Sequence, residues 1–178
     1  ICIKWAYDVP ETFHARYSAT ARRYRYVILN TPVRPALFRG QVTWNYRILD
    51  HELMRAASVF LLGENDFTTF RSVECQSKTP MRCITALNVS RFSNWIVIDI
   101  TANAFLHHMV RNIAGVLMSV GAGKHPPQWV GEILNAKDRR LGAETAPPYG
   151  LYLVDVDYHA AFGIKKQALG PFFLKEGV

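Results

Sequence analysis

The sequence predicts an α+β fold, and three observations point to it. Several segments alternate apolar and polar residues with a period of two, which is typical of strands. Two longer segments carry apolar residues three or four positions apart, which is typical of helices. From residue 22 onward the predicted order is strand, helix, strand, strand, helix, with a short added helix before a final strand. This split β-α-β order is the ferredoxin-like plan, in which an antiparallel sheet carries its helices on one face.

The stretch from Trp95 to Gly121 shows both patterns in succession. Its first part is a predicted strand with Ile96, Ile98 and Ile100 on one side. The period then changes, and the apolar stripe of a helix is predicted to consist of Leu106, Val110, Ile113, Leu117 and Val120. The residues that lie off this stripe are His107, His108, Arg111, Asn112 and Gly115. We therefore expect a polar helix face to open at the end of the strand.

Turn and capping residues bound the other elements. Strands besides the one at Trp95 are predicted over residues 1–9, 22–29, 82–92 and 151–158. Ser93-Asn94 is a two-residue connection of the hairpin type. Together these strands give a sheet of about five members. The second face of this sheet, which no predicted helix covers, is expected to be free.

Two further helices are predicted, one over residues 51–62 with Asp50 as its N-cap, and one over residues 128–136. The buried side of the first helix is expected to consist of Leu53, Ala57, Phe60 and Leu61. Both assignments rest on capping residues and on apolar spacing.

Three irregular segments complete the prediction. Residues 63–81 form a long polar loop that Phe67 and Phe70 anchor. Residues 137–140 form a solvated helix end, and the end of the chain from Gly163 onward is loosely docked.

The chain has 178 residues, of which 49% are hydrophobic, and we expect a single domain over residues 1–178. No apolar run is long enough to span a membrane and no signal-peptide pattern occurs, so the sequence predicts a cytoplasmic protein with no membrane partner. Cys2, Cys75 and Cys83 include no C-x-x-C pair, which argues against a disulfide framework and a structural zinc site. Three free thiols are expected.

The formal charge of +7 is concentrated in one part of the sequence. Between Thr12 and Leu49 there is no Asp or Glu. The same segment contains seven arginines, namely Arg16, Arg22, Arg23, Arg25, Arg34, Arg39 and Arg47. Such a segment produces a positive surface potential and predicts a polyanionic partner. Arginine suits this role because it holds phosphate through two parallel hydrogen bonds and stacks on bases.

Arginine and tyrosine alternate along the predicted strand at residues 22–29. Arg22 and Tyr24 share one face with Tyr26, and Arg23 and Arg25 share the other. In a nucleic-acid interface, arginines neutralise phosphates while tyrosine rings stack on unpaired bases. The alternative is an ordinary edge strand whose tyrosines cover the core and whose arginines are solvated. The lack of acidic residues favours RNA or DNA as the partner.

Other chemistries have little support in the sequence. His107 and His108 are adjacent, so they point about 100° apart on a helix. No carboxylate stands three or four residues away from either to complete a metal site. No G-x-S-x-G nucleophile elbow and no glycine-rich phosphate-binding motif is present. We therefore expect neither a metal nor a cofactor.

Five separated strings resemble, in order, the tRNA pseudouridine synthases of the TruA family: FHARYSATARRYRY, LLGENDFTTFRS, CQSKTP, ITANAFLHHMVRNIAGVLMSVG and YGLYLVDVDY. The likeness extends over nearly the whole chain. It implies one half of a ferredoxin-like pseudouridine synthase catalytic fold. It further implies an enzyme that isomerises uridines 38–40 of the tRNA anticodon stem-loop to pseudouridine without cofactor or metal. The partner would be tRNA, and the full-length protein would be a homodimer.

The resemblance assigns roles to individual residues. Tyr24 would stack on the target base, Arg111 would pair with the catalytic aspartate, and Leu151 would close the floor of the pocket. From the pattern of its helix, Arg111 would instead be a solvated cation. Contacts to tRNA are expected from Phe13, His14, Ala15, Arg16 and Tyr17 and from Glu74, Cys75, Gln76, Ser77 and Lys78, and the arginine pattern adds Arg22, Arg23 and Arg25.

One motif of the family is missing from this sequence. The family's nucleophile is an aspartate in a G-R-T-D motif, which does not occur here. The sequence starts at Ile1, within a predicted strand and without a methionine. We therefore expect the C-terminal part of the enzyme, inactive without the preceding part. Asp66 in the NDFTTF string is expected to have a capping or turn role and not a catalytic one.

Two other functions remain open. A noncatalytic RNA-binding module of ferredoxin-like shape would fit the same fold, although the K/R-G-F/Y-G/A-F-V-x-F/Y string of an RRM does not occur. A small-molecule regulatory domain would leave the arginine-rich segment unexplained. Binding of tRNA that weakens steeply with salt would separate the nucleic-acid functions from the small-molecule function.

Overall fold

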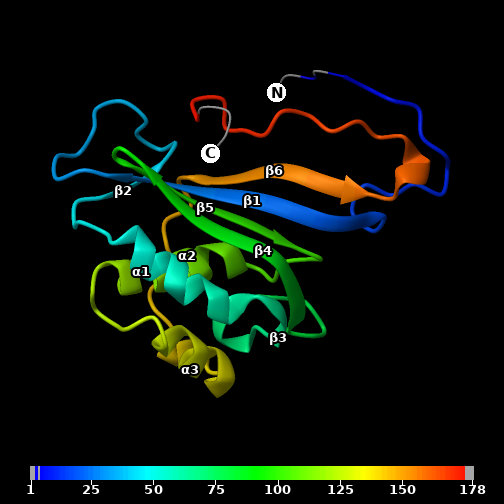
Figure 1. Ribbon diagram of the computed structural model, residues 1–178. Helices are drawn as coiled ribbons and strands as arrows, with labels where there is room; N and C mark the ends of the chain where they lie inside the picture. The colour runs from blue at the N-terminus through cyan, green and yellow to red at the C-terminus, as the bar shows by residue number, and fades with distance from the viewer. Residues whose placement is uncertain (1–2, 4, 175–178) are drawn as a thin grey trace.

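A six-stranded sheet forms one layer of the molecule, and the three α-helices cover one of its faces (Figure 1). The computed structural model describes residue 3 and residues 5–174. The strands are β1 (Ala19–Asn30), β2 (Thr43–Asn45), β3 (Gly63–Asp66), β4 (Met81–Phe92), β5 (Trp95–Ala102) and β6 (Leu151–Tyr158). The helices are α1 (His51–Ser58), α2 (Met109–Gly121) and α3 (Trp129–Ala136), with 3-10 turns at Val59–Leu61, Thr68–Phe70, Arg139–Leu141 and Ala160–Phe162. The predicted α+β fold is confirmed.

β1 is the strand on which the sheet is built. β5 pairs antiparallel with one edge of β1, where Tyr24 lies opposite Ile100. The other edge is shared, because β6 pairs antiparallel with the first part of β1 and β2 pairs parallel with its end. β4 pairs with β5 through the predicted hairpin, and β3 pairs with β4. The order β6-β1-β5-β4 is that of the predicted split β-α-β fold.

The strand predicted over residues 1–9 is wrong for the residues that the structure describes. Residue 3 and residues 5–9 are irregular and exposed, and Trp5 packs beside Tyr7. Residues 1, 2 and 4 lie outside the described part of the chain. No described strand of the sheet pairs with residues 5–9. The sheet gains β2 and β3 instead, and β3 comes from the start of the segment predicted as a long loop.

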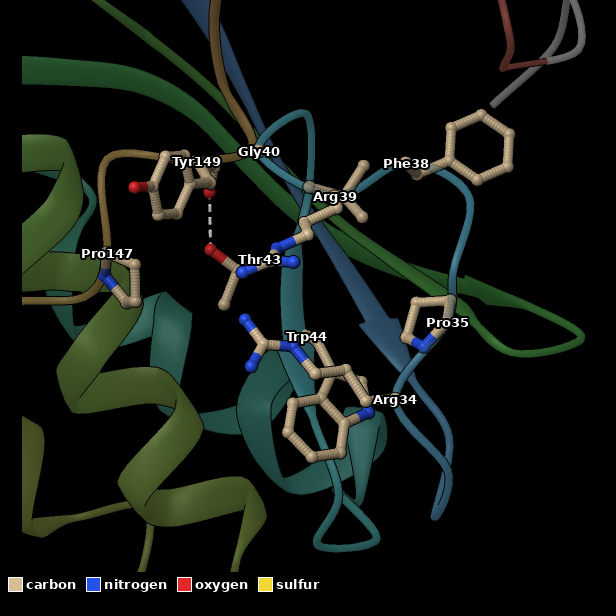
Figure 2. Close-up of a pocket in the computed structure, with 10 residues that line it drawn as sticks. Arg34, Pro35, Phe38, Arg39, Gly40, Thr43, Trp44, Pro147 and Tyr149 are labelled. Carbon is tan, nitrogen blue, oxygen red and sulfur yellow. Dashed lines mark hydrogen bonds between the residues drawn. The ribbon is translucent and has the colours of Figure 1, made fainter.

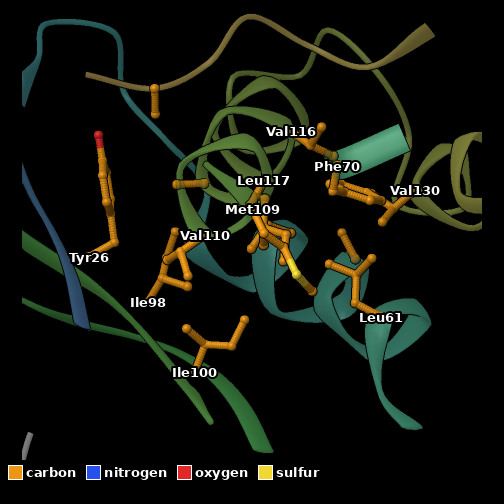
Figure 3. Packing of buried hydrophobic residues seen from close by; sticks show 14 of the residues in the cluster. Tyr26, Leu61, Phe70, Ile98, Ile100, Met109, Val110, Val116, Leu117 and Val130 are labelled. Carbon is orange, nitrogen blue, oxygen red and sulfur yellow. The ribbon is translucent and has the colours of Figure 1, made fainter. Parts of the chain in front are cut away.

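The main hydrophobic core lies between the sheet and the helices (Figure 3). Tyr26 of β1 and Ile98 and Ile100 of β5 lie in one cluster with Met109 and Leu117 of α2, and all five are fully buried. Burial of each large apolar side chain contributes about 1.5–3 kcal/mol, so this layer fixes α2 against β1 and β5. The structure confirms the predicted burial of Ala57, Leu61, Phe67, Phe70, Leu106, Val110, Ile113, Leu117 and Val120.

The buried side predicted for α1 is partly wrong. The helix begins as expected, with the Asp50 carboxylate as its N-cap. However, Leu53 and Phe60 are 37% and 42% exposed. The α-helix ends at Ser58 and continues as a tighter 3-10 turn, so the angular spacing of one continuous helix no longer holds at Phe60. Met54 takes the core position that Leu53 was expected to fill.

The polar face predicted for α2 is smaller than expected. His107 and His108 precede the helix, and His108 has a left-handed backbone with φ 61°. Asn112 is 1% exposed, and its amide nitrogen donates to the carbonyl of Phe70 at 2.8 Å. Its side-chain oxygen accepts hydrogen bonds from Arg139 and Thr145, so Arg139 is not merely part of a solvated helix end. The segment after α3 covers this side of α2.

The second face of the sheet is not free. A smaller hydrophobic cluster on that face consists of Val27, Leu29, Val42, Val97 and Leu174. The rings of Phe38 and Phe173 pack against Trp95, with centroids 5.3 and 5.9 Å apart. Apolar residues on both faces of β1 and β5 explain this cover, because either face would otherwise expose them to water.

The end of the chain is packed, contrary to the prediction of loose docking. The C-terminal segment, residues 163–174, runs along the sheet on the side opposite the helices (Figure 1). Arg25 donates to the carbonyl of Gly170 at 3.0 Å. Lys166 forms ion pairs with Asp155 and Asp157 of β6. Leu174 is 7% exposed within the smaller cluster. Hydrogen bonds, ion pairs and apolar burial therefore all hold this segment.

The hydroxyl of Tyr26 joins three segments on the helix side of β1. It donates to the carbonyl of Pro147 at 2.8 Å and lies 2.6 Å from the hydroxyl of Thr43. Thr43 in turn donates to the carbonyl of Tyr149. Burial raises the pKa of Tyr26 to about 12, although Thr43 and Arg111 partly oppose this effect. The side chain thus connects β1, β2 and the segment that leads into β6.

Gly115→Ala is expected to destabilise the protein. A Cβ atom at this position would lie 2.1 Å from the carbonyl oxygen of Glu144, which belongs to the segment that crosses α2. Overpacking of this kind costs about 1–3 kcal/mol. Urea unfolding followed by circular dichroism measures the loss. Ser119→Ala, one turn further along α2, is the control, with an expected change below about 0.5 kcal/mol. Equal stability of the two variants would contradict the prediction.

Tyr26 is expected to make stability fall at high pH. The pKa is about 12 in the folded protein, against an ordinary value of 10.0. The unfolded chain therefore loses the proton first, and the free energy of unfolding decreases as the pH rises from about 10 to about 12. The full decrease is of the order of 3 kcal/mol. Urea unfolding of wild type and Tyr26→Phe at pH 9 and pH 11 checks this, because the variant should lose less stability between the two.

Candidate nucleic-acid interface and substrate hollow

A hollow of about 770 Å³ lies on the helix side of the sheet, at the start of β1. Its lining consists of Arg16, Arg22, Tyr24, Glu74, Cys75, Gln76, Ser77, Arg82, Ala104, Phe105 and His107. These residues come from the turn before β1, from β1 itself, from the loop before β4 and from the connection between β5 and α2. The structure therefore brings together two of the segments predicted to contact tRNA and the tyrosine predicted to stack on the base.

Tyr24 is half-buried in the wall of this hollow. The alternation along β1 puts its side chain on the same face as Tyr26, toward the helices. The rings of Tyr24 and Phe105 pack edge to face, with centroids 5.1 Å apart and planes at 87°. Burial raises the pKa of Tyr24, and the nearby charge of Arg22 partly opposes it. The tyrosine ring is therefore held in a defined orientation and remains neutral at physiological pH.

Arg111 and Leu151 lie on the same side of the sheet as Tyr24. Leu151 pairs with Tyr26 across the β1–β6 ladder and packs against the main core. Arg111 donates from Nε to the carbonyl of Ala146 at 2.8 Å. Its charge lies near enough to Tyr26 to lower the pKa of that hydroxyl against the larger effect of burial. Neither Arg111 nor Leu151 belongs to the lining of the hollow at Tyr24, although both lie on the same face of the sheet.

The turn at residues 13–17 has a defined structure. Phe13 packs against Tyr158 and Phe162 at ring distances of 5.1 Å each. The Nδ1 atom of His14 accepts the backbone N–H groups of Arg16 and Tyr17. The backbone carbonyl of Ala15 accepts a hydrogen bond from the hydroxyl of Tyr158 at 2.8 Å. These contacts hold the exposed part of the turn on a rigid base.

Arg16 and Tyr17 form the outer surface of this turn. The ring of Tyr17 is 76% exposed, and the guanidinium of Arg16 lies 5.7 Å from its centroid. Arg16 also lines the hollow. An exposed cation beside an exposed aromatic ring suits contact with a phosphate and a base.

The loop at residues 74–78 forms another wall. Glu74, Gln76 and Ser77 line the hollow together with Cys75, whereas Lys78 is exposed outside the lining. Arg71 fixes this loop by donating to the carbonyls of Cys75 and Ser77.

The thiol of Cys75 is buried at the base of this loop, and its sulfur accepts the backbone N–H of His107 at 3.4 Å. Burial raises the pKa of Cys75, but the N–H groups of His107 and Ser77 and the charge of Arg71 outweigh it, so that the pKa is lowered. Cys83 is also a free thiol, and Cys2 lies outside the described residues.

The three arginines predicted to contact tRNA on β1 do not share a surface. Arg22 is on the Tyr24 face, but Arg23 and Arg25 are on the opposite face. Both pair there with Asp99 of β5, at 2.7 and 2.8 Å, and Arg25 is 4% exposed. The carboxylate thus neutralises part of the arginine-rich segment from a distant position in the sequence. The role of Arg23 and Arg25 as tRNA contacts stays a prediction, and this placement does not support it.

The sequence is similar to known proteins over nearly its whole length. Residues 57–159, more than half of the chain, match the family model described as tRNA pseudouridine synthase. The chain belongs to this family. It is 66% identical over 176 residues to tRNA pseudouridine synthase A of Legionella pneumophila strain Corby, covering 99% of this chain and 67% of the relative. The same named protein of Enterobacter sp. strain 638 is 56% identical and that of Alcanivorax borkumensis 53%, with 65% and 66% of the relatives covered.

A second hollow, of about 520 Å³, lies at the other end of β1 beside β2 (Figure 2). Arg34 lies 5.6 Å from the ring of Trp44, and Arg39 and Tyr149 also line it. The arginine-rich segment predicted a basic surface here, but the sequence did not indicate a hollow. Beside it, Gly150 allows the chain before β6 to pass close to β1, where a Cβ would lie 2.3 Å from the carbonyl of Val27.

Sequence reasoning missed two residues that shape the first hollow, Phe105 and Arg82. Phe105 belongs to the connection between β5 and α2, for which the apolar period predicts no contact with β1. Arg82 reaches the loop at residues 74–78 and donates to the hydroxyl of Ser77 at 2.6 Å. Within the described residues, no group of three or more His, Cys, Asp or Glu side chains could hold a metal ion. No helix in that part of the chain is long and apolar enough to cross a membrane.

Asp99→Asn is expected to destabilise the chain strongly. The substitution removes the carboxylate that pairs with the buried guanidinium of Arg25 and with Arg23. Removal of one member of a buried ion pair costs about 3–5 kcal/mol. Thermal and urea unfolding measure the loss. Asp138→Asn, whose partner Arg140 is at the surface, is the control and should leave stability nearly unchanged. A small effect of Asp99→Asn would mean that the pair on the second face is not important for folding.

Proposed function

We propose that the complete protein is a tRNA pseudouridine synthase that isomerises uridines 38–40 of the anticodon stem-loop. The chain spans about two thirds of the length of the relatives that it matches, 67% in the Legionella proteins. In this proposal these residues provide one wall of the substrate pocket, and the nucleophilic aspartate lies in a preceding part. One observation carries the proposal: Tyr24 lines an arginine-bordered hollow on the same side of the sheet as Arg111 and Leu151.

The reaction explains why such a hollow is needed. Isomerisation breaks the bond between the sugar and N1 of uracil, rotates the base, and forms a bond from the sugar to C5. The proton on C5 is released to solvent, and N1 gains a proton. The target base must leave its stack and enter a pocket that holds it while it is detached. A half-buried tyrosine ring held by Phe105 can stack on the base, and arginines at the rim can hold the phosphates on either side. Atoms balance without an oxidant or reductant, so the proposal includes no cofactor.

Arg111 is the proposed partner of the absent carboxylate. Within the described residues Arg111 has no ion pair with any Asp or Glu. Its Nε is fixed on the carbonyl of Ala146, which sets the direction of the guanidinium. A carboxylate placed against it would stay ionised, because an opposite charge within about 4–6 Å favours the charged form.

We further propose that the complete protein is a cytoplasmic homodimer. Light scattering would test whether it is a dimer.

The assay for this function is the release of tritium from [5-³H]uridine in a tRNA transcript. A chain extended to the length of the relatives is expected to release tritium from positions 38–40, and the 178-residue chain is expected to release none. Activity of the 178 residues would show that the catalytic aspartate is not missing. Salt-sensitive tRNA binding by the extended chain without any tritium release would instead favour a noncatalytic RNA-binding module.

Tyr24→Leu in the extended chain is expected to lower kcat/KM. Stacking of a base on an aromatic side chain is worth about 1–3 kcal/mol, which corresponds to a loss of about 5- to 150-fold. Tyr24→Phe keeps the ring and should retain activity within a few-fold of wild type. Loss of activity in Tyr24→Phe equal to that in Tyr24→Leu would mean that the hydroxyl, and not the ring, carries the function.

A further inference from the structure

Arg22 connects three separate segments through its guanidinium. Nη1 donates to the carbonyls of Ala19 and Asn103, both at 2.8 Å, and Nη2 donates to the carbonyl of Arg16 at 2.5 Å. Arg16 belongs to the turn at residues 13–17, and Asn103 follows the end of β5. One side chain therefore ties the turn before β1 to the connection that leads into α2.

These segments form two facing parts of the hollow at Tyr24. Arg16 lines it on the side of the turn, and Ala104 and Phe105 line it on the side of the connection. The connection is itself fixed, because the side-chain oxygen of Asn103 accepts the backbone N–H groups of Cys83 and Ala104. Arg22 thus holds the turn against the fixed connection between β5 and α2. This connection includes Phe105, whose ring contacts Tyr24.

Arg22 is poorly placed to bind phosphate itself. A guanidinium has five N–H donors in a planar fork, and three hydrogen bonds of Arg22 already go to backbone carbonyls. The Arg22 side chain is also partly buried, whereas Arg16 is exposed. Arg16 has its guanidinium over the exposed ring of Tyr17 and is the better phosphate ligand of the two.

We propose that Arg22 is a positioning residue, which acts on tRNA through the turn at residues 13–17 and not by direct contact. This inference rests on the proposed function. When the guanidinium is removed, the turn is no longer held at its distance from Tyr24. The exposed Arg16 still contacts phosphate, but the base beside that phosphate no longer reaches the ring of Tyr24. Misplacement of this kind weakens productive binding even though every phosphate ligand is still present.

The salt dependence of tRNA binding tests the proposal. Arg22→Gln and the matched control Arg16→Gln are made in the chain extended to the length of its relatives, and dissociation constants are measured from 50 to 200 mM salt. Loss of a phosphate ligand lowers the slope of log K against log salt by about 0.7–0.9. We expect this change in Arg16→Gln. Arg22→Gln should weaken binding at least about tenfold with its slope unchanged. An equal fall of the slope in both variants would overturn the proposal.

Arg22→Lys supplies a second test, which also serves if Arg22→Gln does not fold. Lysine keeps the charge and remains a phosphate ligand, but its single ammonium cannot span three carbonyls from separate segments. A positioning role predicts a raised KM for tRNA at 25 °C with a smaller change in kcat. Wild-type KM and kcat in Arg22→Lys, with or without a lower Tm, would contradict positioning. If wild type releases no tritium, the proposed function fails, and the binding comparison still decides the role of Arg22.

Discussion

The register between β1 and β5 is the constraint on which the rest of the structure depends. Because side chains alternate along a strand, the pairing of Tyr24 with Ile100 sends Tyr24 and Tyr26 to the helix side. The same register sends Arg23 and Arg25 to the other side, where Asp99 receives both. A shift of one residue would bury two arginines under α2 and move the tyrosines to the second face. The hollow, the main core and the charge pairing on the second face thus share one cause.

The predictions from sequence succeeded where the signal was local. The strand at residues 151–158, the Asp50 cap and the hairpin at Ser93-Asn94 all depend on neighbouring residues, and the structure has each of them. The prediction that the second face of the sheet is free was wrong, because the residues that cover this face are distant in the sequence. Val27 and Val97 lie on that face, but the residues that cover it, Phe38 and Phe173, lie in irregular segments without periodicity.

The candidate site shows the same division. The tyrosine and the two segments around the hollow were predicted from their residues and from the family resemblance, and the structure brings them together. The pattern could not show that Asp99 would neutralise Arg23 and Arg25 from a strand that is distant in sequence. It also could not show that Arg22 bonds to backbone carbonyls, because such bonds depend on tertiary geometry and not on residue type. Seven arginines in the acid-free segment therefore give a smaller basic surface than their number suggests.

The cover of the second face has a consequence for how the chain assembles. The β4–β5 hairpin and its contacts with α2 join residues that are close in sequence, so they can form early. The contact of Phe38 and Trp95 with Phe173 closes much longer loops, and Leu174 is among the last described residues of the chain. Contacts between distant residues form slowly, because the entropy of loop closure is lost before they contribute. We therefore expect the β4–β5 hairpin and α2 to become ordered first, and the cover at Phe173 to form last.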